Sequence, residues 1–505
     1  MHLAILPILI PLMAGILLLL VKHFGLKNQR ILSVTMMIVL IIISFLALFQ
    51  VLQNNLVIYA VGGWQAPFGI VLVLDRLSIL MVIVTSLLAL GALWYAIASD
   101  TDKMGAHFHV LFQLQLFGLN GAFLTGDLFN LFVFFEILLL ASYSLLLHGE
   151  GNGRTKAGLH YVVINLVGST LFLFAVGTLY GIVGTLNIAD LANKISILPS
   201  SNVGIVAAAG LLLLVVFGLK AAMFPLYLWL PGAYSKTSAP VAALFAIMTK
   251  VGIYAIIRVH GTIFSDNAGE LANYYAPWVL NAGLITLVMA TFGAMSAKEL
   301  KNQIAYLVLA SVSTLLISIG MHSVAAMSGA IYYMIHSTLI AGGFFLLSDI
   351  IVRSRGQIRG KLIKAPLFSN SVFIGSLFFL YAVAIASMPP LSGFFGKLMI
   401  LFAAIDHQHA GIILTVVLLS GLFIVVTLAK TGSQIFYDTD NSVEPIHTKI
   451  TNKYFSPVLF LFIFAPLMAI FANPITEFTH HTAEMIFNTN AYIEAVLNIS
   501  TETRQ

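Results

Sequence analysis

Four ionisable side chains lie near the middle of long apolar stretches, where burying a charge is costly. Glu136 interrupts the stretch DLFNLFVFFEILLLASYSLLL, and Lys220, Lys250 and Lys397 stand in three further stretches. A lysine or an acid at the centre of a membrane-spanning helix costs about 2.5–3.5 kcal/mol, so such residues usually face the protein interior and serve a function. Titratable groups of both signs in successive buried segments indicate a pathway for protons.

Two of the lysines lie beside prolines. Lys220 precedes Pro225 in GLKAAMFPLYLWLP, and Lys397 follows a Pro-Pro pair in MPPLSGFFGKLMILF. Proline donates no backbone hydrogen bond and clashes with the carbonyl four residues before it, which for Pro225 is that of Ala221. We therefore expect a helix that breaks just after Lys220, with room for water beside the ammonium group. We also expect a second broken helix with Lys397 at its break.

Lys250 lies in the Ala-rich stretch APVAALFAIMTKVGIYAIIR, which predicts one span at 239–260. Ala243 and Ala246 share its face and should let another helix approach closely. His336, in GAIYYMIHSTLIAGG, fits a packed, hydrogen-bonded side chain as well as a proton carrier. Lys430 fits a side chain that snorkels to the membrane interface.

Glu136 has a role that follows from its charge. Burial makes a lysine give up its proton more readily, and a nearby carboxylate favours the protonated form again. If the carboxylate can move towards or away from Lys220, it decides whether that lysine holds or releases a proton. We therefore expect Glu136 to be an electrostatic switch that is partnered by Lys220.

The elements that must hold these groups are membrane-spanning helices. Of the 505 residues, 60% are hydrophobic and 9% are charged, whereas a soluble domain has about 25% charged residues. Apolar runs of about twenty residues recur along the chain, which predicts an all-α, polytopic membrane protein with about fourteen transmembrane helices. The seventh and twelfth runs, 204–235 and 370–405, are too long for simple helices and are expected to be the broken ones.

Basic residues are distributed unevenly between the two sides of this arrangement. Of the 24 Lys and Arg residues, sixteen fall in or beside the odd-numbered loops, and four lie inside apolar stretches. The opposite side has only Arg76, Lys194, Arg258 and Arg504. Because cytoplasmic loops are rich in Lys and Arg, we expect both termini outside. The stretch 483–497 fits a short amphipathic helix along the membrane or a neighbouring subunit, and equally a disordered end.

Several kinds of chemistry are excluded or disfavoured. The chain has no cysteine, which excludes disulfides and Cys-ligated iron–sulfur clusters. The segment GEGNGRTKAG lacks the spacing of a phosphate-binding loop, and no metal site is expected at the histidine pairs in 107–109 and 407–409. We expect no cofactor and a transporter subunit rather than an enzyme. A stand-alone permease for a small organic solute is a disfavoured alternative.

An internal duplication is predicted by three separations of 176, 177 and 180 positions, which join His160 to His336, Lys220 to Lys397 and Lys250 to Lys430. A near-constant offset predicts two five-helix repeats, the second inverted, as in secondary transporters. We expect an N-terminal segment at 1–107, repeats at 108–260 and 261–437, and a last helix with a tail at 438–505. The offset places Glu136 near Ser313–Thr314, so the acid has no twin.

Three motifs carry a resemblance to a known family: GDLFNLFVFFE, GLKAAMFPLYLWLPGAYSKTSAPVAALFAIMTKVGIYAIIR and MPPLSGFFGK. They are similar to segments of the antiporter-like membrane subunits shared by Mrp-type sodium/proton antiporters, respiratory complex I and membrane-bound hydrogenases. The resemblance implies that Glu136 and Lys220 are a pair on a hydrophilic proton axis. It also implies that Lys250 is the central lysine, that His336 bridges, and that Lys397 stands in the second broken helix.

Within this family the chain most resembles the Mrp D branch, because it has Glu at 136, Lys at 397 and the tail AYIEAVL. This implies a hetero-oligomeric complex in the bacterial inner membrane that moves protons and sodium ions, with a related A subunit and a small C subunit as partners. A proton-pumping subunit of a redox complex is the alternative. Neighbouring genes or co-purifying proteins would distinguish the two.

Overall fold

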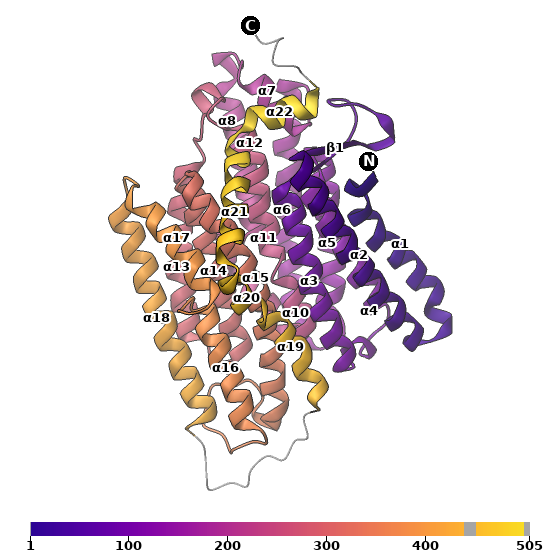
Figure 1. Cartoon of the computed structure of the whole chain (residues 1–505), viewed down its shortest axis with the longest axis vertical. Helices are drawn as coiled ribbons and strands as arrows, with labels where there is room; N and C mark the ends of the chain where they lie inside the picture. Colours follow the sequence, from indigo (N-terminus) through magenta and orange to yellow (C-terminus); the bar gives the residue numbers. More distant parts are fainter. Residues whose placement is uncertain (1, 439–450, 499–505) are drawn as a thin grey trace.

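The computed structural model describes residues 2–438 and 451–498 as a bundle of helices, most of which run along the long axis of the molecule (Figure 1). Twelve helices are long and apolar enough to cross a membrane. The predicted runs at 108–125 and 370–405 hold three shorter apolar helices, Phe108–Leu124, Ser371–Ile385 and Ser392–Ile405. An all-α, polytopic membrane protein is confirmed, and the number of helices that cross the membrane stays a prediction.

The first part of the bundle includes a short hairpin that we did not predict. It pairs β1 (Val57–Ala60) with the antiparallel strand β2 (Val71–Leu74), at the end of the bundle where the chain begins (Figure 1). The helices of this part are α1 (Leu6–Val21), α2 (Leu26–Asn54), α3 (Arg76–Ala98), α4 (Phe108–Leu124), α5 (Leu128–Leu147), α6 (Asn152–Val183), α7 (Ile188–Ile195) and α8 (Ser200–Lys220).

The remaining helices complete the bundle, with α18 at its edge and α15 inside it (Figure 1). They are α9 (Trp229–Lys236), α10 (Ala239–Phe245), α11 (Met248–Ala255), α12 (Gly261–Ile263), α13 (Ala276–Ser296), α14 (Leu300–Gly320), α15 (Val324–Ser354), α16 (Ser371–Ile385), α17 (Ser392–Ile405), α18 (Ala410–Phe436), α19 (Phe455–Phe462), α20 (Phe464–Ile470), α21 (Ala472–Phe487) and α22 (Thr489–Leu497).

The seventh predicted run is broken beside Pro225. α8 ends at Lys220, and the chain resumes as α9 only after a turn and the short helix η5 (Leu226–Leu228). The predicted helix end just after Lys220 is confirmed. Ala222 has a positive φ of 56°, and the N–H of Met223 donates to the carbonyl of Gly218 at 2.7 Å. The last turn of α8 is therefore closed by the backbone itself.

The second break closes in the same way. Ser387, just after α16, has a positive φ of 61°, and the N–H of Met388 donates to the carbonyl of Val383 at 3.0 Å. Lys397 lies in the second turn of α17, so its predicted place at the break is wrong. The reason is that the Pro-Pro pair precedes α17, where proline does not hinder a helix.

The spacing of the two breaks differs from the spacing of the lysines. The residues that turn the chain at the two breaks, Ala222 and Ser387, lie 165 positions apart. The offset of 177 that relates Lys220 to Lys397 therefore does not superimpose the breaks. Lys220 ends the helix before its break, whereas Lys397 lies within the helix after its break. The inverted repeats stay a prediction.

A third interruption, next to Lys250, was not predicted. The expected span at 239–260 consists of α10, α11 and the π-helix η6 (Ile256–His260), with a turn at 246–247. No proline or glycine lies within 241–251 to mark this turn, and neighbouring helices enclose the whole segment. The expected close approach at Ala243 is confirmed, because a Cβ on Gly342 of α15 would lie 3.5 Å from the Ala243 carbonyl oxygen.

The described part of the tail is helical and packs on its own chain. α22 buries Tyr492, Ile493 and Val496, and it lies against α7. One face of this helix is therefore covered by the subunit itself, while Asn490 and Ala491 are exposed. Both described ends of the chain lie at the hairpin end of the bundle (Figure 1). The side of the membrane that they face stays a prediction.

At the opposite end, Arg30 of α2 holds the turn that follows α3. Its guanidinium lies 2.8 Å from Asp100 and 2.6 Å from Asp102, and His109 lies 3.1 Å from Asp102. The hydrogen bond from Arg30 lowers the pKa of Asp100 to about 2. Burial raises the pKa of Asp102, but hydrogen bonds from His109 and Arg30 outweigh burial and leave it below its ordinary value.

These lowered pKa values predict a stability loss in acid. A carboxylate of this kind stabilises the fold above the unfolded-state pKa of about 3.9, and the contribution disappears as pH falls through the folded-state pKa. Between about pH 4 and pH 2, we expect the melting temperature of the detergent-solubilised protein to fall more steeply for wild type than for Arg30→Gln. Scanning fluorimetry measures it, with the exposed Lys27→Gln as control. Equal slopes in wild type and Arg30→Gln would contradict the prediction.

Candidate functional site

Glu136 lies on α5 at the contact with α6, and its side chain is only partly buried. The hydroxyl of Ser169 on α6 donates a hydrogen bond to its carboxylate. The acid therefore has a fixed partner on the next helix and one side towards the surface of this chain.

Lys220 does not form a direct ion pair with Glu136. Its ammonium group donates to the side-chain oxygen of Asn165 at 3.1 Å and lies 5.5 Å from the centre of the Phe135 ring. Asn165 and Ser169 are one turn apart on α6, so each holds one member of the predicted pair. The structure brings Glu136 and Lys220 to the same face of α6, where each binds a different polar side chain of that helix.

Small cavities adjoin two of the lysines. One of about 10 Å³ lies beside Lys220 and is also lined by Asn165 and Trp229. Another of the same size lies beside Lys397, and its polar lining includes Ser311 and Thr314. A cavity of this size is close to the space that a single water molecule needs. Among the residues that the structure describes, no acidic side chain lines either cavity.

Lys250 is fully buried, and within the described chain no protein group hydrogen-bonds its ammonium nitrogen. Burying a charged ammonium group without a partner is strongly unfavourable. Its neighbour Gly252 packs on the first break. A Cβ at that glycine would lie 2.4 Å from the backbone nitrogen of Ala221 and 2.8 Å from the carbonyl carbon of Lys220. The two lysines thus sit on helices whose backbones touch at the break.

His336 connects the two halves of the second broken helix. Its Nε2 lies 2.9 Å from the carbonyl oxygen of Ala384 in α16, and its Nδ1 lies 2.7 Å from the hydroxyl of Ser392 in α17. A carbonyl can only accept, so Nε2 carries a proton and donates it. In the neutral ring Nδ1 then accepts from the Ser392 hydroxyl. Protonation at Nδ1 would require that hydroxyl to turn away.

Tyr333 lies between His336 and Lys397. Its ring is stacked on the imidazole with centres 6.2 Å apart, and the Lys397 ammonium group lies 5.7 Å from its centre. The close packing of α17 on α15 depends on two glycines. A Cβ at Gly393 would come within 2.5 Å of His336 Nε2, and one at Gly396 within 3.0 Å of Tyr333. The glycines of the motif MPPLSGFFGK thus also let His336 reach the second break.

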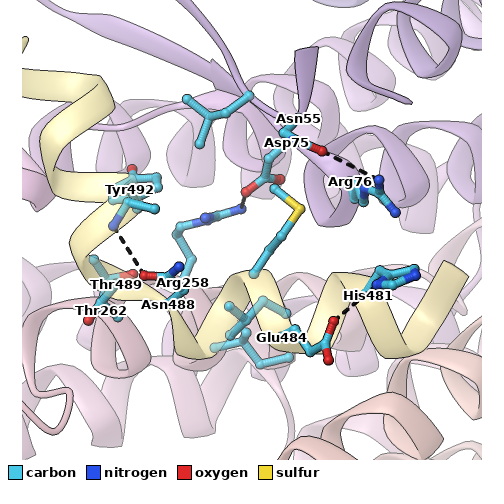
Figure 2. Close-up of a pocket in the computed structure, with 15 residues that line it drawn as sticks. Asn55, Asp75, Arg76, Arg258, Thr262, His481, Glu484, Asn488, Thr489 and Tyr492 are labelled. Atoms are coloured by element: carbon cyan, nitrogen blue, oxygen red, sulfur yellow. Dashed lines mark hydrogen bonds and ion pairs between the residues drawn. The ribbon is translucent and has the colours of Figure 1, made fainter. Parts of the chain in front are cut away.

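Beyond Lys250, the π-helix η6 leads to a buried ion pair at the hairpin end of the bundle. Arg258 lies 2.5 Å from Asp75, and both side chains are less than a tenth exposed. Figure 2 shows Arg258 reaching Asp75 beside Tyr492, at a hollow of about 370 Å³. Arg258 is therefore buried at this end of the bundle, where Tyr254 of α11 and Tyr492 of α22 lie against its guanidinium group.

Sequence reasoning missed the polar partners of the charged residues. Tyr161, Asn165 and Ser169 follow one another at intervals of four in α6, which places them on one face, and that spacing could have revealed them. Ser392 offers no comparable signal. His160, which the numbering pairs with His336, lies on the exposed side of α6 and takes no part in the cluster.

Comparisons with known proteins agree with the fold. A protein-family model described as "NADH:quinone oxidoreductase/Mrp antiporter, TM" matches residues 125–423. The probable D subunit of a K(+)/H(+) antiporter from Rhizobium meliloti is 37% identical, with 98% of each chain covered. The D subunit of a Na(+)/H(+) antiporter from Alkalihalophilus pseudofirmus is 36% identical, with 98% of this chain and 99% of the relative covered.

Solved structures extend this likeness. A chain of the Mrp complex from Dietzia sp. DQ12-45-1b superimposes with a TM-score of 0.87 at 26% identity, covering 98% of this chain and 99% of that one. A chain of respiratory complex I from Thermus thermophilus gives 0.80 at 23% identity, covering 96% and 99%, and shares the fold. The chain belongs to the NADH:quinone oxidoreductase/Mrp antiporter transmembrane family.

Proposed function

We propose that the chain is the proton-translocating subunit of a multisubunit sodium/proton antiporter, in which Glu136, Lys220, Lys250, His336 and Lys397 relay protons. The observation that carries the proposal is the position of Lys220 at the end of a broken helix, bound to Asn165 one turn away from the serine that binds Glu136. The relatives, which are named as D subunits of antiporters, support the antiporter. A transporter subunit, rather than an enzyme, follows from the same names.

In this proposal each half of the bundle contains a lysine that can take up and release a proton, Lys220 in the first half and Lys397 in the second. A proton on Lys220 is stabilised by the negative charge of Glu136, so the carboxylate sets when the lysine releases it. Lys250 receives the proton in the centre, where no group of the described chain hydrogen-bonds its ammonium nitrogen. His336 then passes it to the cavity beside Lys397 by exchanging its hydrogen bond with Ser392.

The position of His336 gives it two tasks in this relay. Its Nε2 donates a hydrogen bond to the carbonyl of Ala384 at the end of α16. Its Nδ1 is the nitrogen through which a proton would pass. A change of protonation at Nδ1 would alter its bond to Ser392 at the start of α17, so charge movement would be coupled to the join between two half-helices. Gly393 makes this possible, because a side chain there would occupy the place of the ring.

The proposed setting is a complex in the bacterial inner membrane with a related A subunit and a small C subunit, and with both termini outside. We further propose two inverted repeats, at 108–260 and 261–437, between the N-terminal segment 1–107 and the last helix and tail at 438–505. The asymmetry of basic residues supports the orientation. The relatives include both a sodium and a potassium antiporter subunit, and we propose sodium as the coupled ion.

A proton-pumping subunit of a redox complex is the second candidate. The observation in its favour is the shared fold with respiratory complex I and with an archaeal sulfane sulfur reductase, whose chain superimposes with a TM-score of 0.87 at 22% identity. The full-length relatives named as antiporter subunits favour the first candidate. Identifying the proteins that co-purify in mild detergent separates the two, because only a redox complex includes electron-transfer subunits.

The relay predicts that Lys220→Ala abolishes sodium-driven proton exchange in inverted vesicles, because alanine cannot carry the proton and Asn165 loses its partner. The complex should still assemble, since the helix end is closed by backbone bonds. A pH-sensitive dye measures the exchange, and affinity purification measures assembly. Lys194→Ala is the matched control and should be unaffected, because Lys194 is an exposed lysine that pairs with Asp190. Wild-type exchange in Lys220→Ala would remove this lysine from the relay.

A second prediction separates a charge role from a structural role at Glu136. Glu136→Gln keeps the volume and can still accept from Ser169, so a structural acid would tolerate it. If the charge matters, the exchange rate should fall about tenfold or more, since one decade corresponds to about 1.4 kcal/mol. Glu136→Asp, which keeps the charge but withdraws it by one methylene, should retain partial activity. A Gln variant with a near wild-type rate would leave Glu136 with a structural role only.

A further inference from the structure

A second hollow, of about 610 Å³, opens at the end of the bundle opposite the hairpin. It lies between the end of α13, the start of α14, the loop at 361–363 and the last turns of α18. Three lysines line it, Lys298, Lys361 and Lys430. This is the part of the chain that holds Lys430, which the proton relay does not use.

The three lysines lack acidic partners, unlike other lysines at this end of the bundle. Within the described residues no carboxylate lies within 4.0 Å of Lys298, Lys361 or Lys430, whereas Lys301 pairs with Asp349 and Lys364 pairs with Asp438. The acid that lines the hollow, Glu299, is bound to Lys236 at 3.1 Å. The hollow therefore has a surplus of positive charge.

The backbone holds two of these lysines together. The N–H of Leu300 donates to the carbonyl of Gly360 at 2.8 Å, and the N–H of Leu362 donates to the carbonyl of Lys298 at 3.0 Å. Lys298 and Lys361 are thus presented by one paired loop. The hollow also contains Gln303, whose amide nitrogen donates to Thr431 at 2.9 Å and whose buried side-chain oxygen has no partner within the described chain.

Exposed apolar side chains form part of the wall of the hollow. Met295, Ile363 and Val426 line it, and each side chain is about half exposed. α18 stands at the edge of the bundle (Figure 1). A free anion would neutralise the lysines but leave this apolar surface bare. The chemistry that fits both parts is a phosphate group attached to hydrocarbon chains.

We propose that this hollow binds an anionic phospholipid, with its phosphate among the three lysines and its acyl chains along α13 and α18. A headgroup hydroxyl, as in phosphatidylglycerol, supplies the donor that the Gln303 oxygen lacks. Basic pockets between membrane helices bind anionic headgroups in this way. The lipid would lie in the leaflet on the Lys- and Arg-rich side. The inference does not depend on the proton relay.

Native mass spectrometry of the intact complex tests the proposal. The complex is purified in mild detergent, supplied with phosphatidylglycerol or with phosphatidylcholine, and the lipid that remains bound is counted. Neutralising one lysine near an anionic group should weaken binding about fivefold. Lys298→Gln/Lys361→Gln/Lys430→Gln should therefore lose the bound phosphatidylglycerol. Lys364→Gln, an exposed lysine of the same loop outside the hollow, should keep it. The exposed sites leave folding intact, which the melting temperature checks.

A photoactivatable phosphatidylglycerol supplies the second readout and should label Met295, Val426 or their neighbours. Four results would overturn the proposal: equal retention in the triple variant, equal retention of phosphatidylcholine, full displacement by a millimolar excess of inorganic phosphate, or cross-linking of the lysines to a neighbouring subunit. Displacement by phosphate would indicate a free-anion site. The cross-link would indicate a protein interface.

Discussion

Inside a membrane every backbone N–H and carbonyl must find a partner within the protein, and this requirement decides how the helices of this chain are interrupted. At the first break the indole of Trp229 donates to the carbonyl of Leu219 at 3.1 Å, and the hydroxyl of Thr286 accepts from the N–H of Phe224 at 2.9 Å. At the second break His336 donates to Ala384. Backbone groups that are free at the helix ends are thus hydrogen-bonded by side chains from other elements.

The charged groups are separated by polar intermediaries, which affects how easily they could change state. Breaking a directly bonded buried ion pair costs about 3–5 kcal/mol, because one charge is left without compensation. Lys220 instead bonds the neutral oxygen of Asn165, and Glu136 bonds Ser169. Such contacts can be exchanged at lower cost. The two halves also differ, since Lys397 faces Ser311, Thr314 and Tyr333 where Lys220 has an acid within reach.

The sequence by itself determined the class of the fold and the end of α8. A proline bars the helix locally, and apolar runs of membrane length admit no other element, so both could be predicted without knowing what surrounds them. The family motifs also directed attention to Lys220 and Lys397, each of which lies on one of the two broken helices. Local rules do not extend to a residue such as Lys397, because a proline before a helix does not show how soon the helix begins.

Only the tertiary structure decided which groups touch. The turn beside Lys250 has no proline or glycine to mark it, and the enclosing helices impose it. The ion pair of Arg258 was not predicted, because its partner Asp75 lies 183 positions away in the chain. The hollow at Lys430 is likewise formed by segments that are far apart in the chain, namely α13, α14, the loop at 361–363 and α18. Contacts between distant segments depend on the packing of whole helices, and periodicity along one segment carries no information about them.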